Sequence, residues 1–128
     1  MDEIFCKLAE ILQSVLPKNW DKALLYSELD ENSYDISFYC RLKKNNVYMQ
    51  CYELEKYGIL EKSIDSAIEG IYNILRQLWL ESKSQETIWT NCTFSLTSDG
   101  KFNFDYDYTN LVDCAYEYRE QWKKKYLK

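Results

Sequence analysis

The 128-residue sequence has no histidine, only one proline and only three glycines. Without an imidazole, a nucleophilic thiol or hydroxyl lacks its commonest general base, and zinc lacks a common ligand. The scarcity of proline and glycine leaves little room for long flexible segments. No apolar run approaches the ~20 residues of a membrane span, and no signal peptide opens the chain. We therefore expect one domain over residues 1–128, free of membrane and resident in the cytoplasm.

Acidic side chains outnumber basic ones by 21 to 16, which gives a net charge of −5. Such a body repels nucleic acid and attracts basic partners. Basic residues do gather near the C-terminus, but Glu117 and Glu120 interrupt them. We interpret this segment as the charged end of a helix, and we expect no direct binding of nucleic acid.

Five cysteines are widely spaced and form no Cys-x-x-Cys pair: Cys6, Cys40, Cys51, Cys92 and Cys114. Their odd number, and positions that match the apolar phase of the predicted elements, indicate reduced thiols in a core. A zinc site would need these thiols together with carboxylates from distant segments. We predict no metal and no cofactor, since the sequence also lacks a glycine-rich phosphate loop.

Hydrophobic periodicity predicts an α+β domain with the order α-βββ-α-ββ-α and an antiparallel five-stranded sheet. Helical spacing covers residues 3–16, 62–82 and 110–126, the last beginning at the good N-cap Asn110. Strands are predicted over 20–29, 34–43, 47–54 and the two halves of 89–108. The first strand is apolar on both phases, which favours a strand that is covered on both sides or placed centrally.

The clearest pattern is the hairpin over residues 89–108. Apolar and polar residues alternate on both sides of Ser98-Asp99-Gly100, which is a turn signal. After the turn, one phase is aromatic and is expected to be buried: Phe102, Phe104, Tyr106 and Tyr108. The other phase carries Asn103, Asp105 and Asp107, which we expect to face solvent.

The same phase defines a candidate binding surface. If Cys92 and Phe104 face the helices, the opposite sheet face carries Tyr39, Tyr48, Tyr52, Asn103, Asp105 and Asp107. Tyrosine is frequent in protein interfaces, and carboxylates beside it would steer a basic partner. A second acidic cluster, with Glu28 and Asp30, surrounds the first predicted turn.

Short motifs in both halves of the chain resemble those of the YezG-like immunity family. They are Leu16-Pro17-x-x-Trp20, then Trp89-Thr90-x-Cys92-x-Phe94, then Asp99-Gly100 followed by Phe104-Asp105-Tyr106. The resemblance implies a small acidic protein encoded beside a secreted polymorphic toxin, commonly a nuclease, from which it protects the producing cell. It also implies core positions for Trp20, Trp89, Phe94 and Phe104, and leaves Asp105 and Asp107 to carry binding.

We therefore predict an immunity protein, not an enzyme, that occludes the cleft of a cognate basic nuclease. Carboxylates would mimic phosphate charge and tyrosines would fill the cleft; a contact-dependent growth-inhibition system would suit the same layout. Two other classes stay open. One is an adaptor or chaperone-like module with an apolar groove between sheet and helices. The other is a hydrolase that uses Asp105 and Asp107, although no neighbour in the sequence would separate their pKa values.

Overall fold

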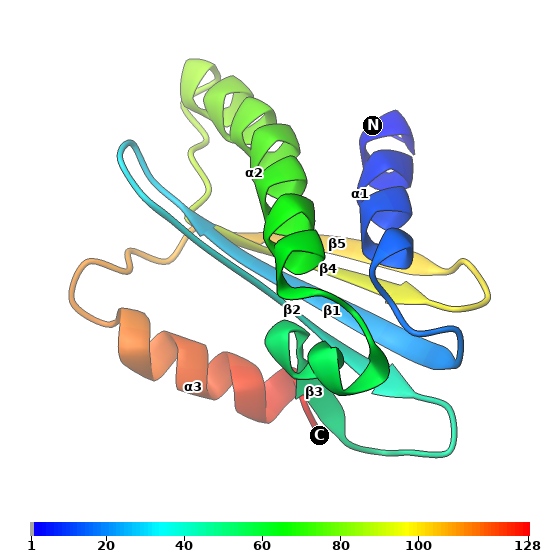
Figure 1. The fold of residues 1–128 in the computed structure, drawn as a ribbon. Helices are drawn as coiled ribbons and strands as arrows, with labels where there is room; N and C mark the ends of the chain where they lie inside the picture. The colour runs from blue at the N-terminus through cyan, green and yellow to red at the C-terminus, as the bar shows by residue number, and fades with distance from the viewer. Residues whose placement is uncertain (1) are drawn as a thin grey trace.

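The computed structural model describes residues 2–128 and confirms the α+β class and the predicted order of elements. The sheet is antiparallel, with the spatial order β3-β2-β1-β4-β5. Its strands are β1 (Trp20–Leu29), β2 (Tyr34–Leu42), β3 (Tyr48–Gln50), β4 (Asn91–Thr97) and β5 (Phe102–Asp107). Helices α1 (Asp2–Ser14) and α2 (Glu61–Ser84) lie on one face, and α3 (Ala115–Tyr126) lies on the other (Figure 1).

The first strand was predicted to be covered on both sides or placed centrally, and the structure shows both. β1 pairs with β2 on one side and with β4 on the other, so that Leu25 lies between Phe38 and Phe94. Leu25 belongs to the core beneath α1 and α2, while its neighbours Leu24 and Tyr26 belong to a second cluster beneath α3. Both phases of β1 are therefore buried, as its apolar composition requires.

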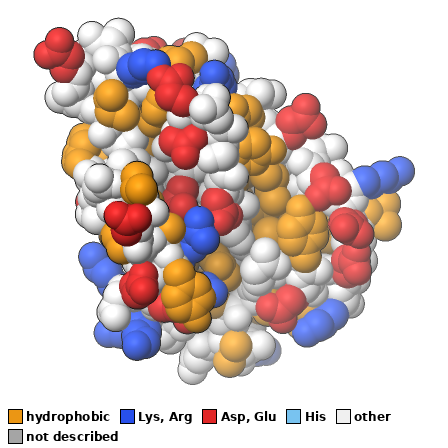
Figure 2. Space-filling view, turned by 90° about the vertical axis from the view of Figure 1, so that its left-hand side faces the viewer, with side chains coloured by type: hydrophobic (Ala, Val, Ile, Leu, Met, Phe, Trp, Pro, Cys, Tyr) orange, Lys and Arg blue, Asp and Glu red, His pale blue; other side chains and the backbone are white. Residues whose placement is uncertain are grey.

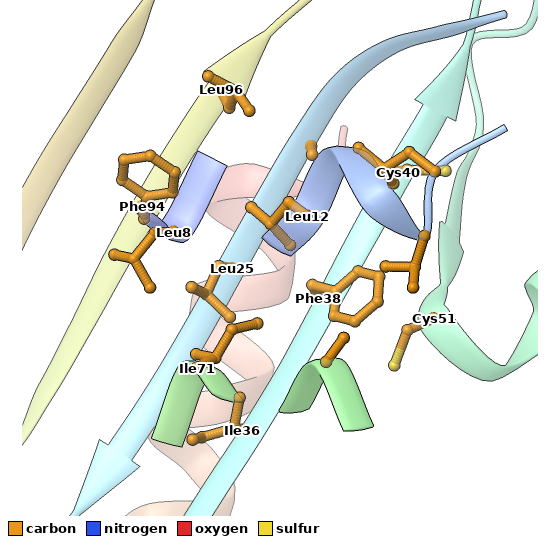
Figure 3. Packing of buried hydrophobic residues seen from close by; sticks show 14 of the residues in the cluster. Leu8, Leu12, Leu25, Ile36, Phe38, Cys40, Cys51, Ile71, Phe94 and Leu96 are labelled. Carbon is orange, nitrogen blue, oxygen red and sulfur yellow. The ribbon is translucent and has the colours of Figure 1, made fainter. Parts of the chain in front are cut away.

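The larger core fills the space between the sheet and the first two helices. Leu12 of α1, Ile71 of α2, Phe38 and Phe94 are completely buried there (Figure 3). Each such side chain contributes about 1.5–3 kcal/mol by leaving water. α1 approaches α2 closely at Gly70, where an added Cβ would lie 3.2 Å from Cδ1 of Ile11.

The β4–β5 hairpin turns as predicted, but one of its aromatic rows is less buried than expected. Gly100 adopts a φ of +91° and its N–H donates to the Thr97 carbonyl at 2.9 Å. Cys92, Phe94 and Leu96 of β4 are buried. On β5, however, Phe104 and Tyr106 are half-buried and Phe102 is 49% exposed; Tyr108, directly after the strand, is 57% exposed. The prediction was wrong for these two because they lie at the two ends of an edge strand, which has a neighbouring strand on one side only.

The strand predicted over 47–54 is also shorter than expected. It ends at Gln50, where a capping box starts the 3₁₀ helix η1 (Cys51–Tyr57). The Gln50 side chain accepts from the amide of Tyr52 at 2.9 Å, and Glu53 accepts from the amide of Gln50 at 3.0 Å. Tyr52 therefore lies on η1 and not on the sheet.

The last helix starts later than predicted, at Ala115 instead of residue 110. The Asn110 side chain accepts from the amide of Val112 at 3.0 Å, so it stabilises a turn rather than a helix N-terminus.

The five cysteines are free thiols, of which Cys40, Cys51 and Cys92 are buried. The predicted apolar placement is wrong for Cys6, which is exposed on α1, and holds only in part for the half-buried Cys114. Burial raises the pKa of the Cys40 thiol to about 11, and it also raises the pKa values of Cys51 and Cys92. The buried thiols stay protonated near neutral pH, which makes them weak nucleophiles.

Candidate binding surface

A thin aromatic layer holds α3 against the second face of the sheet. Trp122 lies at its centre, with its ring centroid 4.9 Å from that of Tyr26 and 5.6 Å from that of Tyr39. The indole N–H of Trp122 donates to the hydroxyl of Thr93 at 2.8 Å. Tyr118 and Tyr126 pack around the same cluster from one turn before and one turn after.

Two polar anchors accompany this layer, and the first uses Glu28. The Arg119 guanidinium donates to both carboxylate oxygens of Glu28 at 2.7 Å, and the Tyr26 hydroxyl donates to the same carboxylate at 2.7 Å. The Glu28 side chain is only 12% exposed. Glu28, which the sequence suggested as a binding residue, therefore uses its carboxylate to position α3.

The second anchor is Asp107 at the end of β5. Its carboxylate accepts from the Tyr118 hydroxyl and from the amides of Tyr108 and Thr109, the amide distances being 2.6 and 3.2 Å. The hydrogen bond from Tyr118 is the main reason that the pKa of Asp107 lies below its ordinary value. Asp107 thus keeps a negative charge while it joins β5 to α3.

Asp105 and Asn103 are exposed on the same phase of β5. The Asn103 side-chain amide donates to the Asp105 carboxylate at 2.7 Å. Asp105 also lines a groove of about 470 Å³ between β5 and α3, together with Asp107, Tyr118, Trp122, Lys125 and Tyr126. The structure thus brings the two predicted carboxylates together beside three aromatic rings.

The predicted tyrosines lie on the other side of α3. Tyr39 and Tyr52 line a separate groove of about 460 Å³. The Tyr52 hydroxyl donates to Asp65 at 2.5 Å, and this bond raises the pKa of Tyr52. Tyr48 is half-buried, which raises its pKa, and the guanidinium of Arg41 lies 5.4 Å from its ring centroid.

Asp30 lies at the end of the molecule where β1 turns into β2. Its carboxylate accepts from the amides of Asn32 and Ser33 at 2.9 and 2.8 Å, and the Asn32 bond is the main cause of its lowered pKa. Asp30 and Glu28 border a third groove of about 490 Å³, together with the exposed Val112. Figure 2 shows this end of the molecule, where acidic and apolar side chains are interspersed.

The six residues predicted to share one sheet face therefore do not form one continuous surface, because α3 crosses the face that was expected to be open. Sequence reasoning missed the residues of α3 that divide it, above all Tyr118, Arg119 and Trp122. The signal was present in the spacing of Tyr118, Trp122 and Tyr126, which are four residues apart and share one side of a helix.

The apolar groove expected of an adaptor finds no support in this geometry. The space between the sheet and α1 and α2, where an adaptor groove was expected, is filled by fully buried side chains such as Leu8 and Leu12. Among the side chains that the structure describes, no three from Cys, Asp or Glu gather as a metal site would require. No helix within residues 2–128 is both long and apolar enough to cross a membrane.

Comparison with known proteins agrees with the sequence motifs. The family model described as "Immunity protein YezG-like" matches residues 1–128. The chain is 26% identical to the immunity protein YezG of Bacillus subtilis (strain 168), over 99% of this chain and 87% of that protein. It is 21% identical to the type VII secretion system protein EsaG of Staphylococcus aureus, over 91% of this chain and 72% of that protein. The chain therefore belongs to the YezG-like immunity protein family, with a toxin-neutralising role and no enzymatic activity.

Proposed function

We propose that this protein neutralises a nuclease toxin in the cytoplasm by covering the cleft in which the toxin binds nucleic acid. One observation carries the proposal: Asp105 and Asp107 line one groove with the rings of Tyr118, Trp122 and Tyr126. Asp107 is held in its charged form by Tyr118 and by two backbone amides. Asp105 is exposed and free to meet a partner.

The chemistry of this groove complements a nuclease cleft. Such clefts hold phosphates with Lys, Arg and backbone N–H groups, so their surfaces are positively charged. Fixed carboxylates can take the place of phosphates, while aromatic rings bury area at a low entropic cost. The net charge of −5 would also speed the encounter with a basic toxin.

The relatives support a toxin that is made inside the cell and then secreted. Two of them are named as immunity proteins and one as a type VII secretion system protein. A cell that produces such a toxin is at risk until export, and we place this protein at that stage. It would bind toxin molecules that have not yet left the cytoplasm.

Co-expression with the toxin encoded beside its gene tests the proposal. The wild-type protein should restore growth and co-purify with the toxin. Asp105→Lys should weaken protection, whereas Glu69→Lys, which makes the same charge change on an exposed position of α2, should not. Asp107 is left unchanged, since its replacement would also release Tyr118. Equal protection by both variants would place the contact elsewhere, and a lack of protection by the wild type would refute the toxin-binding role.

A second measurement addresses the nuclease class and the occlusion. The purified toxin should degrade RNA or DNA, and a stoichiometric amount of this protein should stop it. Raising the salt concentration should slow complex formation, because the encounter is steered by exposed charges. A toxin that leaves nucleic acids intact would overturn the nuclease assignment alone.

A further inference from the structure

The outer edge of β5 is an open end of the sheet. Within residues 2–128, β5 pairs with β4 on one side and with no strand on the other. An unpaired edge presents a row of N–H and C=O groups that can accept another strand. In Figure 1 this edge lies at the rear, past α1.

The register identifies which backbone groups face outward. The amide of Thr97 donates to the carbonyl of Lys101, so these two residues form a hydrogen-bonded pair at the start of the ladder. Bonded and non-bonded pairs alternate in an antiparallel ladder. Residues 103, 105 and 107 therefore direct their backbone groups at β4, and Phe102, Phe104 and Tyr106 direct theirs at solvent.

The opposite edge of the sheet is protected, and β5 is not. β3 contains only three residues before the chain coils into η1, which makes it a poor template for another strand. β5 is twice as long and contains no proline and no lysine, and its pairing with β4 runs from Asn91 to Leu96 without a register shift. Apart from the carboxylates of Asp105 and Asp107, the usual devices that blunt an edge strand are missing here.

We propose that β5 is the docking edge for the toxin, which adds one extended strand to the sheet. This inference rests on the proposed function and specifies how the partner is held. The incoming strand alternates basic and apolar side chains. Its basic residues lie beside Asp105 and Asp107, and its apolar residues lie against Phe102, Phe104 and Tyr106 on the α1 side of the sheet.

Charge excludes the most obvious competitor, a second copy of this chain. Two β5 strands side by side would place the carboxylates of Asp105 and Asp107 from both copies along one face. Like charges opposite each other destabilise strand pairing, and each copy carries a net charge of −5. A basic strand converts the same carboxylates into an attraction.

The first test uses a short synthetic peptide of alternating Lys and Val as the probe. We expect saturable binding to the ¹⁵N-labelled protein. Hydrogen exchange at the amides of Phe102, Phe104 and Tyr106 should slow on binding, while residues 103, 105 and 107 are already protected. The same peptide with Glu in place of Lys should not bind. A version N-methylated at alternate residues, which keeps the side chains and loses backbone donors, should not bind either.

A pair of variants separates the backbone from the side chain. Phe102→Pro removes one outward N–H and leaves the β4 ladder intact, and Phe102→Ala removes the same ring but keeps the N–H. Loss of one hydrogen bond at the edge should weaken peptide binding about tenfold in the proline variant relative to the alanine variant. If the proline variant does not fold, the N-methylated peptide still provides the comparison.

The outcomes distinguish this inference from the proposed function. Failure of the Lys–Val peptide to bind, or equal binding of its N-methylated version, would overturn docking at β5. If Phe102→Pro then protects cells from the toxin as well as Phe102→Ala does, immunity stands and the toxin docks elsewhere. If the peptide binds at the edge but the wild-type protein does not protect cells, the proposed toxin-neutralising role is refuted. Strand addition at β5 would then still stand.

Discussion

The two faces of the sheet are covered by side chains of different types. Beneath α1 and α2 the core is mostly aliphatic, with Leu8, Leu12, Leu25 and Ile71 completely buried. Beneath α3 the buried cluster contains only Leu24, Tyr26 and Trp122, and half-buried tyrosines and charged anchors surround it. The first face has the composition of a folding core, and the second has the composition of an interface.

This difference suggests a division of work between the faces. Aliphatic burial involves no titrating group and no charge that salt could screen, and it supplies most of the favourable free energy of folding. Hydrogen bonds and ion pairs contribute little net stability but fix geometry and charge. We expect changes under α1 and α2 to unfold the domain, and changes under α3 to alter the grooves while the sheet persists.

The largest effect is expected from Phe94→Ala. The ring is fully buried and lies 6.0 Å from that of Phe104, so its removal should cost about 3–5 kcal/mol of unfolding free energy. Phe104→Ala should cost less, because that ring is only half-buried. Urea denaturation followed by circular dichroism measures both. A larger loss for Phe104 would contradict the deeper burial of β4 relative to the edge strand β5.

Trp122→Ala should have the next largest effect, and of a different kind. The cost cannot exceed the free energy that docks α3, so we expect about 2–3 kcal/mol and not the full penalty for an emptied aromatic site. Hydrogen exchange should show α3 exchanging rapidly while β1 and β4 stay protected. Trp122→Phe keeps an aromatic ring and should retain α3 in place. Simultaneous loss of protection in β1 would contradict the division between the faces.

Arg119→Met should destabilise the protein by about 1–2 kcal/mol, because it leaves the largely buried Glu28 without its cation. The matched change is Lys123→Met, which removes a cation 3.3 Å from Glu120 on the exposed side of the same helix. That change should cost well under about 1 kcal/mol, as exposed ion pairs generally do. Thermal unfolding of both variants at low salt provides the comparison, and equal melting temperatures would show that Glu28 needs no partner.

The smallest expected effect concerns pH and Asp107. Its folded-state pKa lies below the ordinary value, so its charged form stabilises the fold above the ordinary carboxyl pKa, and that contribution disappears as pH falls through the folded pKa. Asp107→Asn should therefore lose about 1 kcal/mol at neutral pH and approach the wild type in acid. Melting temperatures between neutral and acidic pH test this. Tyr118→Phe removes the main hydrogen-bond donor to the Asp107 carboxylate. In that background the difference in melting temperature that Asp107→Asn causes at neutral pH should be smaller.

Sequence patterns predicted the fold well wherever one residue phase meets a core. The apolar phases of β1, β2 and β4 and the stripe of α2 were identified because burial on that scale dominates local preferences. The patterns failed where a local hydrogen bond decides the conformation. Alternation continues through Met49 and Cys51, yet the Gln50–Glu53 capping box turns the chain into η1.

The candidate site was less accessible to sequence reasoning for a related reason. Periodicity shows which residues share a face but not what covers that face. Asp105 and Asp107 were found because they alternate with aromatic residues along β5. The roles of Glu28 and Asp107 as anchors of α3 depend on partners far away in the sequence, Arg119 and Tyr118. No spacing rule connects such pairs.

The strand order also sets the course of folding. The β1–β2 and β4–β5 pairs are each joined by a short turn, so they can form quickly as local hairpins. Joining them requires β1 to pair with β4 across the segment that contains β3, η1 and α2, and closing a long loop is slow. The anchors of α3 come from β1, β4 and β5, and they exist together only after that closure. The full set of contacts that holds α3 is thus completed only after β1 has joined β4, which makes the docking of α3 a reporter of the fully native state.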